Sequence, residues 1–557
     1  MFRKVVTTFL FLLWAAPGIA DVDTAWVRRY NGPGNDYDEA CAIAIDDLGN
    51  VYVTGGSKDS VTTIDYLTIR YDPNGDTVWT RRYNGPRSIG DQARSIAVDA
   101  CGNVYVTGAS ESDYAVIKYH PDGDTAWTRR YDGVCGIIDS FCTDSVYSAS
   151  EYSCAIAVDD YGNVSVTGES YFLNIDYATL KFDSDGDTAW VRRYDGGVRK
   201  SDWAVDIAAD DSGNVYVTGT SDGGNQTYGD MTTVKYLPNG DTAWVRRYNG
   251  PANHWDYAKA MTIDDWGNVY VTGAIGLKWY TEYGTVKYYA NGDTAWTRIF
   301  RGPADYWDKP HDIAVDSIGN VYVTGYYYDY FGTYMDYGTV KYDSDGAQLW
   351  LRRYDGTASY HDWAVALAVD DRCNVYVVGN SHGDGTDHDI VTIKYDTHGN
   401  ELWVQRYNGP ADTADYASAI AVDDSGNVYV CGYSVGCGTG FDYVTIKYVQ
   451  TPVQVTDETR DDEQPSEFTL SQSYPNPFNQ TTRIQFKLAN SGHVALTLHD
   501  VLGRKVRTIV SEYLSAGNKS VFWDGKNDSG KGVASGVYFY RIQVGNFSDT
   551  KKLVLLK

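Results

Sequence analysis

The sequence predicts an all-β protein, an eight-bladed β-propeller followed by a small β-sandwich. The first observation is composition: the chain has 49 Tyr, 16 Trp and 56 Gly but only 4 Met, and Tyr, Trp and Gly favour strands and tight turns. The second is internal repetition, because one unit recurs eight times before residue 450. Repeats of this kind indicate a propeller or an array, so an all-helical protein is not expected.

Length and charge narrow the class further. The chain has 557 residues, of which 43% are hydrophobic, enough to build buried cores in several domains. The formal net charge is −27. This charge argues against nucleic acid as a partner, because a phosphate-binding surface needs clustered Lys and Arg.

Residues 1–20 have the pattern of a secretory signal peptide. Arg3 and Lys4 precede a short apolar run, and small residues end at Ala20. We expect cleavage between Ala20 and Asp21. The run is too short for a comfortable membrane span, and no other stretch reaches 18 apolar residues, so no transmembrane segment is expected. The mature protein should therefore be secreted or held at a surface.

Three markers define the repeated unit. They are W-V/T-R-R-Y, G-N-V-Y-V-T-G and D-Y-x-T-I-K-Y, each with variants and each present eight times. The Asn of the second marker recurs from Asn50 to Asn427 at a period of about 54 residues, which is typical of propeller blades. The first marker begins at Trp26, Trp79, Trp127, Trp190, Trp244, Trp296, Trp350 and Trp403.

Each unit is expected to form four short strands, as at 260–263, 269–272, 285–288 and 294–298. These segments are rich in Val, Ile, Thr, Tyr and Trp and are bounded by Gly, Asn and Asp, as strands are. The first two strands are joined by D-D-x-G-N and the last two by a similar turn. In both turns Gly can adopt the positive φ that a bulged hairpin needs.

The two ends of the repeat region complement each other. It opens at Asp21 in the middle of a turn between third and fourth strands, and it ends at Tyr448 after a third strand that has no fourth. We therefore expect the N-terminal strand to complete the eighth blade and close the ring, which removes two unpaired sheet edges.

The repeats resemble the bacterial SBBP-type β-propeller repeats over residues 24–448, most specifically in the G-N-V-Y-V-T-G marker. That family is named for seven-bladed rings, whereas this chain has eight copies. The resemblance implies a secreted or surface protein and implies no reaction.

Four parts of the chain follow from these patterns: a signal peptide at 1–20, the propeller at 21–449, a linker at 450–467 and a C-terminal domain at 468–557. The linker is acidic, polar and contains two Pro, so it should be extended and flexible. The formal charge reverses across it, from −31 in the propeller to +7 in the C-terminal domain.

The last 90 residues alternate as six short strands at 481–488, 494–500, 505–510, 518–523, 537–544 and 551–556, which suits a β-sandwich. They resemble the type A C-terminal sorting domain of the type IX secretion system and are similar to the Ig-like module of flagellar hook-capping proteins. The resemblance implies that the type IX machinery is a partner and that the protein reaches the exterior or the outer-membrane surface of a Gram-negative bacterium. An Ig-like domain without a sorting role is the alternative. The motif residues are Tyr474, Pro475, Asn476, Pro477, Phe478 and Asn479, together with the ending from Lys552 to Lys557.

An acid lies five residues before the central apolar residue of every expected first strand. If the first strands line a channel, these carboxylates surround one mouth and would attract a cation or a basic ligand. The alternative is that each acid accepts backbone N–H groups in the preceding loop. The set is Asp38, Asp91, Glu151, Asp202, Asp256, Asp308, Asp362 and Asp415.

Departures from the repeat are a better guide to a ligand. Four Trp side chains lie beside members of the acidic set, at Trp203, Trp255, Trp307 and Trp363. Exposed aromatic rings next to carboxylates suit sugars, which offer apolar faces and hydroxyl groups. The alternative is that these rings wedge neighbouring blades apart.

No cofactor is expected. Acidic turns such as 183–187 superficially resemble calcium loops, but they lack the twelve-residue frame with a distal Glu. No catalytic residue is nominated, because H-x-x-x-H, H-E-x-x-H and Walker patterns are missing from the sequence. The eight Cys offer two candidate local bridges, Cys135–Cys142 and Cys431–Cys437.

Together these features predict a monomeric, non-enzymatic propeller for ligand binding or adhesion, with an extracellular glycan or protein as its ligand. Two alternatives stay open. One is a surface polysaccharide-degrading enzyme, a hydrolase or a lyase, that uses the face formed by the loops between second and third strands and between neighbouring units. The other is a structural component of the envelope.

Overall fold

The computed structural model describes residues 21–451 and 468–555, apart from 60–62, 88–89, 134–135, 139–151, 172–173, 198–199, 223–227, 278, 305, 330–333, 359, 471–472, 474–475, 477, 479–481, 490–491, 515–516, 524, 528–530 and 546. The chain divides into unit 1, Met1–Val453, and unit 2, Gln454–Lys557. The expected signal peptide and most of the linker lie outside the described residues.

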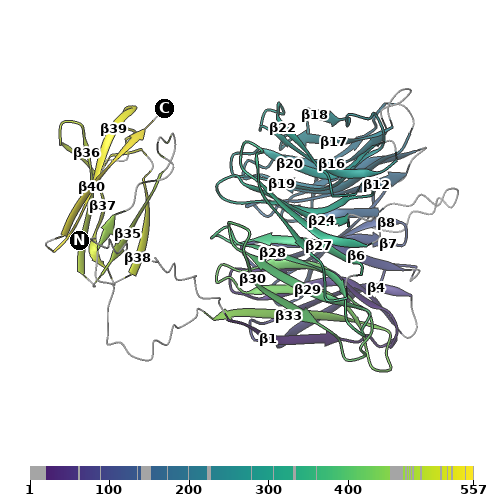
Figure 1. Cartoon of the computed structure of the whole chain (residues 1–557). Helices are drawn as coiled ribbons and strands as arrows, with labels where there is room; N and C mark the ends of the chain where they lie inside the picture. The colour runs from purple at the N-terminus through teal and green to yellow at the C-terminus, as the bar shows by residue number, and fades with distance from the viewer. Residues whose placement is uncertain are drawn as a thin grey trace, which may run out of the picture. The chain divides into compact units, whose positions relative to one another are not determined.

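Eight antiparallel sheets of one plan make up the described part of unit 1 (Figure 1). Seven of them follow chain order, and the second carries an extra edge strand, β10. Sheets one to four contain β2 (Asp38–Ile45), β3 (Val51–Lys58), β4 (Ile64–Tyr71), β5 (Thr77–Tyr83), β6 (Asp91–Val98), β7 (Val104–Ser110), β8 (Asp113–Tyr119), β9 (Thr125–Asp132), β10 (Gly136–Ile138), β11 (Tyr152–Val158), β12 (Val164–Tyr171), β13 (Ile175–Phe182), β14 (Thr188–Tyr194), β15 (Asp202–Ala209), β16 (Val215–Asp222), β17 (Gly229–Tyr236) and β18 (Thr242–Tyr248). Sheets five to seven contain β19 (Asp256–Ile263), β20 (Val269–Gly276), β21 (Thr281–Tyr288), β22 (Thr294–Phe300), β23 (Lys309–Val315), β24 (Val321–Tyr328), β25 (Met335–Tyr342), β26 (Gln348–Tyr354), β27 (Asp362–Val369), β28 (Val375–His382), β29 (His388–Tyr395) and β30 (Glu401–Tyr407).

The eighth sheet joins the two ends of the repeat region. Its order is β1 (Asp21–Tyr30), β33 (Phe441–Thr451), β32 (Val428–Val435) and β31 (Asp415–Val422). Strand β1 pairs antiparallel with β33, from Asp21 opposite Thr451 to Tyr30 opposite Tyr443. The fourth strand of this sheet therefore comes from the start of the described chain.

The first strand of each sheet packs against the first three strands of the sheet before it. Strand β6, for example, contacts β2, β3 and β4, and β31 contacts β27, β28 and β29. The same relation links β2 of the first sheet to β31, β32 and β33 of the last. A side-chain hydrogen bond also joins the last sheet to the first. Trp26 Nε1 of β1 donates to the carbonyl of Pro73 in the first sheet at 3.3 Å.

Each sheet has two distinct ends. At the hairpin end lie the turns from first to second and from third to fourth strand. At the loop end lie the connections from second to third strand and from one sheet to the next. Every first strand carries a β-bulge, as between Ala258 and Ala260 in β19, and a bulge re-aims the extra side chain.

First strands begin earlier than the sequence predicts. Strand β19 starts at Asp256, although the apolar run begins only at Ala260. The extra residues pair with β20 from Asp256 opposite Ile275. Six of the acids expected in loops are strand residues, at Asp38, Asp91, Asp202, Asp256, Asp362 and Asp415, whereas Asp308 directly precedes β23. None of the described segments forms a helix with the length and apolarity needed to cross a membrane.

Unit 2 contains two sheets in its described part. One is β34 (Thr469–Leu470), β35 (Thr482–Leu488) and β38 (Gly517–Trp523). The other is β37 (Lys505–Leu514), β36 (Gly492–Asp500), β39 (Gly536–Val544) and β40 (Phe547–Leu555). Side chains from both sheets share one core, including Ile484, Leu496, Trp523 and Tyr540. The six expected strands are present with slightly different bounds.

Candidate functional site

The acids of the predicted ring are buried, with exposures of 0–1%. Their carboxylates face backbone groups of the preceding loop: Asp362 accepts the N–H of Gly356 at 2.7 Å and of His382 at 3.2 Å. Burial raises the pKa of Asp362 and raises that of Asp256 and Asp308 to about 6. The described members are Asp38, Asp91, Asp202, Asp256, Asp308, Asp362 and Asp415. Glu151 lies outside the described residues, and a ligand role for the set stays a prediction.

The second acid of each repeat caps the turn at the hairpin end. Asp423 accepts the backbone N–H groups of Ser425 and Asn427, the side-chain amide of Asn427 and the hydroxyl of Tyr429 at 2.7–3.0 Å. Asp46 repeats the pattern toward Asn50 and Tyr52. These carboxylates satisfy polar groups of the turn, so they are engaged in the hairpin itself.

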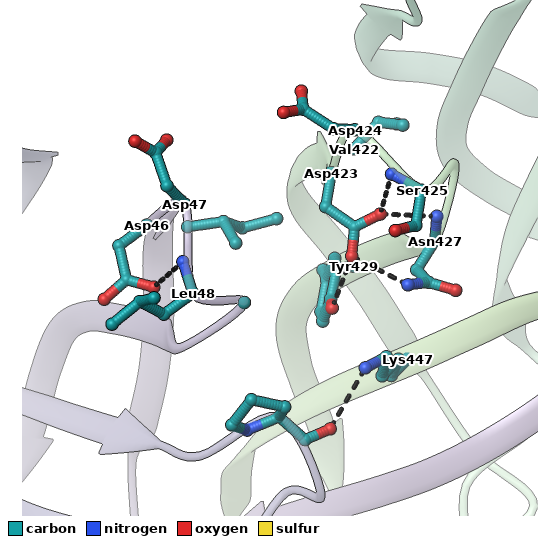
Figure 2. A pocket seen from close by; sticks show the side chains of 13 residues that line it. Asp46, Asp47, Leu48, Val422, Asp423, Asp424, Ser425, Asn427, Tyr429 and Lys447 are labelled. Atoms are coloured by element: carbon teal, nitrogen blue, oxygen red, sulfur yellow. Dashed lines mark hydrogen bonds between the residues drawn. The ribbon is translucent and has the colours of Figure 1, made fainter. Parts of the chain in front are cut away.

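A cavity of about 420 Å³ lies between the turns of the first and last sheets (Figure 2). Asp46, Asp47 and Leu48 line one side and Asp423 and Asp424 the other. Lys447 of β33 donates across its floor to the carbonyl of Pro73 at 3.0 Å. Similar cavities lie between the first and second sheets and between the fourth and fifth. Because these cavities recur at equivalent places, we infer that they result from the packing of equivalent sheets.

Two groups of three carboxylates come close enough to hold a metal ion, Asp176, Asp195 and Asp202, and Asp336, Asp355 and Asp362. An arginine already lies in each group. Arg193 is 3.2 Å from Asp176, and Arg353 is 2.7 Å from Asp336 and 3.0 Å from Asp355. The protein therefore supplies its own cation there.

The acidic turn at 183–187 has a structural explanation. Asp183 accepts the N–H groups of Asp185 and Asp187 at 3.0 and 2.8 Å, which is the local bonding pattern of an Asx turn.

One predicted disulfide is wrong. Cys431 is a buried free thiol in β32, and Cys437 is an exposed free thiol. Six residues of mostly extended chain span roughly 20 Å, whereas a disulfide needs Cα atoms within about 7 Å. The other candidate, Cys135–Cys142, lies outside the described residues.

Aromatic side chains gather at the loop end around the predicted Trp residues. Trp203, Trp255 and Trp363 are partly exposed, and Trp307 is 52% exposed. Trp203 lies 6.1 Å from Trp255 between ring centroids, and Trp255 stacks on Tyr257 at 5.6 Å and 7°. These rings therefore extend from the fourth sheet to the fifth.

Two further groups continue the aromatic surface. In the sixth sheet the ring of Tyr306 lies 5.5 Å from Trp307 and 4.4 Å from Tyr328. In the seventh and eighth sheets His388 lies between Trp363, at 4.8 Å, and Tyr416, at 5.8 Å. The sequence analysis missed Tyr257, Tyr416 and His388. The two Tyr residues share one position, directly after the acid of the first strand. Because the residue type at this position varies between repeats, the position could have marked them in the sequence.

The predicted sorting motif is partly described in unit 2. Asn476 bridges to the last strand, because its side chain donates to the carbonyl of Lys552 at 3.0 Å and accepts the N–H of Val554 at 2.8 Å. Phe478 is buried against Trp523, with ring centroids 5.5 Å apart. These residues therefore tie the start of the domain to its end. Tyr474, Pro475, Pro477, Asn479 and Lys557 lie outside the described residues.

Two family matches identify parts of the chain. A family described as a beta-propeller repeat matches residues 25–59, 78–115, 190–225, 296–326 and 402–436. A family described as the FlgD Ig-like domain matches residues 471–546. The chain therefore contains β-propeller repeats of the SBBP type and an Ig-like domain. No curated protein matches it.

Several solved structures are similar to this chain at low identity and low TM-score. PorZ, a surface component of the type IX secretion system of Porphyromonas gingivalis, is 14% identical with a TM-score of 0.36, over 95% of this chain and 70% of PorZ. The polysaccharide lyase Uly1 is 10% identical with a TM-score of 0.39, over 73% and 89%. The β-propeller domain of the Trilobed protease from Pyrococcus furiosus is 9% identical with a TM-score of 0.39, over 65% and 95%.

Proposed function

We propose that this chain is a secreted or cell-surface protein whose propeller binds an extracellular glycan without cleaving it. The observation that carries this proposal is the aromatic surface at the loop end. Its rings, among them Trp255, Tyr257 and Trp307, are exposed or partly exposed and differ between repeats. Flat, exposed rings offer stacking surfaces for sugar faces, and neighbouring polar groups can bond hydroxyls.

The ring geometry is part of the proposal: eight blades, closed by the N-terminal strand. Support comes from the pairing of β1 with β33 and from the packing of β2 against β31. Closure brings the loop ends of all eight sheets to one rim, where rings from several sheets can contact a single ligand. A monomer meets this requirement without a second copy.

Glycan binding is tested with the full mature chain on a glycan array, followed by calorimetry with any sugar that is retained. Trp307→Ala should weaken binding by about two- to tenfold, since an aromatic stacking contact contributes roughly 0.5–1.5 kcal/mol. The matched control is Trp266→Ala, because Trp266 is 61% exposed at the hairpin end. Retained, intact sugar supports the proposal. Shortened products would favour the enzyme alternative, and no retention would favour a structural role.

Delivery by the C-terminal domain is the second half of the proposal. Its support is the signal-peptide pattern at 1–20 and the resemblance of residues 468–557 to type IX sorting domains. Deletion of 468–557 should leave the protein in the periplasm, as measured by fractionation and immunoblotting. Asn476→Ala, which removes two hydrogen bonds to the last strand, should reduce export in part. Normal release of the deleted chain would contradict the sorting role.

A further inference from the structure

Three basic side chains stand on the first strands of unit 1. They are Arg94 on β6, Lys259 on β19 and Lys309 on β23, and all three are exposed. No other first strand contains Lys or Arg. Arg94 and Lys259 are the extra residues of their β-bulges, and Lys309 opens its strand. The bulges direct Arg94 and Lys259 away from the regular alternation of their strands.

These cations lack the ion pairs that other basic residues of the loop end make. Lys58 pairs with Asp36, and Lys200 lies 3.0 Å from Asp222. Among the described residues, no carboxylate lies within 4.0 Å of the charged groups of Arg94, Lys259 or Lys309. Unpaired cations are unexpected in a region whose formal charge is −31.

Lys259 and Lys309 belong to neighbouring sheets, whose first strands contact each other. Although its side chain is in part exposed, the surrounding protein partly desolvates the Lys259 ammonium group and lowers its pKa, and the charge of Lys309 lowers the pKa further. His311 responds to the same charges: burial is the main cause that lowers its pKa to about 4, and Lys259 and Lys309 add to it. His311 is therefore neutral at pH 7 and adds no third positive charge to the two lysines.

Two acids on the first strands near the lysine pair accept backbone N–H groups. Asp312, on the same strand as Lys309, accepts the N–H of Leu367 at 2.8 Å, and Asp206 accepts the N–H of Met261 at 2.7 Å. Burial raises their pKa values to about 7 and about 6, so Asp312 is partly protonated near neutral pH, whereas Asp206 stays mostly ionised and its charge is directed at the N–H of Met261. A bound anion is the group that would neutralise the lysine pair.

Each lysine has an exposed ring two residues before it. Tyr257, 46% exposed, precedes Lys259 and stacks on Trp255. Trp307, 52% exposed, precedes Lys309, and its indole N–H donates to the carbonyl of Trp279 at 3.2 Å. Two rings that each precede a cation by two residues suit a sugar chain that bears negative groups, since the rings offer faces for stacking and the ammonium groups pair with the anion.

We propose that the ligand of the loop end is an acidic glycan, whose uronate or sulfate group binds Lys259 and Lys309 while its sugar rings stack on Tyr257 and Trp307. This inference rests on the proposed glycan-binding function and adds the ligand's chemical class. Neutral glycans should bind weakly, because they leave the lysine pair without a counter-charge.

The test compares an oligogalacturonate, a sulfated galactan oligosaccharide and a neutral galactan oligosaccharide of equal length, by calorimetry with the full mature chain. The double variant Lys259→Gln/Lys309→Gln should lose at least about tenfold in affinity for the acidic sugars and keep any affinity for the neutral one. Affinity of the wild type for the acidic sugars should fall as salt rises. Lys58→Gln is the matched control, because it removes one paired charge at the same end.

The outcomes separate the two ideas. Neutral and acidic sugars bound equally well, with no effect of the double variant, would overturn the inference and leave glycan binding intact. No binding of any sugar would count against the proposed function, and the lysine pair is then tested alone with inorganic sulfate. Shifts in the ¹³Cε resonances of Lys259 and Lys309 would support an anion site, whereas unchanged resonances would overturn it. The two acidic sugars distinguish carboxylate from sulfate recognition.

Discussion

The hairpin end and the loop end of the propeller repeats differ in how faithfully they follow the repeat. At the hairpin end one set of contacts recurs: Trp190 donates to the carbonyl of Pro238 at 3.0 Å, Trp244 to that of Ala290 at 3.2 Å, and Trp296 to that of Ser344 at 3.0 Å. At the loop end the residue after the repeated acid varies between sheets: three are polar or charged, Glu39, Gln92 and Lys309, and five are aromatic, Tyr152, Trp203, Tyr257, Trp363 and Tyr416.

This difference separates two roles. A contact that every sheet makes with the next one stabilises the assembly of sheets, because each interface needs it. A side chain that occurs in one or two sheets is not required by the repeat, so it can be selected for a ligand. We therefore expect changes at the hairpin end to affect stability and changes at the loop end to affect binding.

The largest expected effect is the loss of a repeated tryptophan. Trp190 is 5% exposed and packs on Tyr236 with ring centroids 5.6 Å apart. Trp190→Ala should lower the free energy of unfolding by about 3–5 kcal/mol, the usual cost of a large buried ring. Trp307→Ala should change it by less than about 1 kcal/mol, because Trp307 is exposed. Equilibrium unfolding in guanidinium chloride measures both variants.

Exposure and position can be separated with a third variant. Trp266 is exposed at the hairpin end, so Trp266→Ala should leave both stability and glycan binding nearly unchanged. Equal losses of stability for Trp190→Ala and Trp307→Ala would contradict the comparison, since they would make the loop-end ring part of the core.

The architecture was predictable because short sequence patterns that recur in every repeat determine it. The period of about 54 residues, the short β-rich runs and the Gly-containing turns predicted four strands per unit, and the all-β class and the propeller repeats are confirmed. Strand starts were less accurate. Asp256 looked like a loop residue because it is polar, yet its pairing with Ile275 and its buried carboxylate place it inside β19.

The candidate site was predictable only in part. The Trp residues were found because they interrupt the repeat beside an acid. Lys259 and Lys309 were missed, because their significance depends on which partners they lack and on a bulge that no residue pattern announces. The acids posed the opposite problem: the sequence singled out Asp362, but only the folded structure shows that its carboxylate accepts the N–H groups of Gly356 and His382.

A second prediction concerns an acid that departs from the repeat. The position of Asp312 is occupied by Ala42, Ser95 or Ala260 in other sheets. Burial raises the pKa of Asp312 to about 7, well above an ordinary unfolded value near 3.9. Its contribution to stability is therefore fully present below about pH 4 and is lost as pH rises through about 7. Asp312→Asn should gain about 2–4 kcal/mol relative to the wild type between pH 4 and pH 8.

Chemical unfolding of both proteins at several pH values measures this gain. Asp206→Asn is the internal comparison and should show a smaller gain in the same direction, because the pKa of Asp206 is raised only to about 6. A constant difference between wild type and Asp312→Asn across this pH range would mean that Asp312 does not titrate as a buried acid.

The smallest expected effect tests the one turn at the hairpin end that departs from the repeat. Cys373 stands where the other first turns have Gly, and it adopts φ of 61°, as Gly426 does at 81°. A side chain costs roughly 1 kcal/mol in this left-handed conformation, so Cys373→Gly should raise the free energy of unfolding by up to about 1 kcal/mol, although the added freedom of Gly in the unfolded chain offsets part of the gain. The reciprocal change, Gly426→Ala, has room for its methyl group, since the nearest atom is 3.7 Å away; it should cost a similar amount through the backbone alone. Unfolding of both variants in guanidinium chloride measures whether each substitution raises or lowers the free energy of unfolding. A loss of stability in Cys373→Gly would mean that the thiol makes contacts worth more than the strain, and the hairpin end would then contain a departure that the fold itself requires.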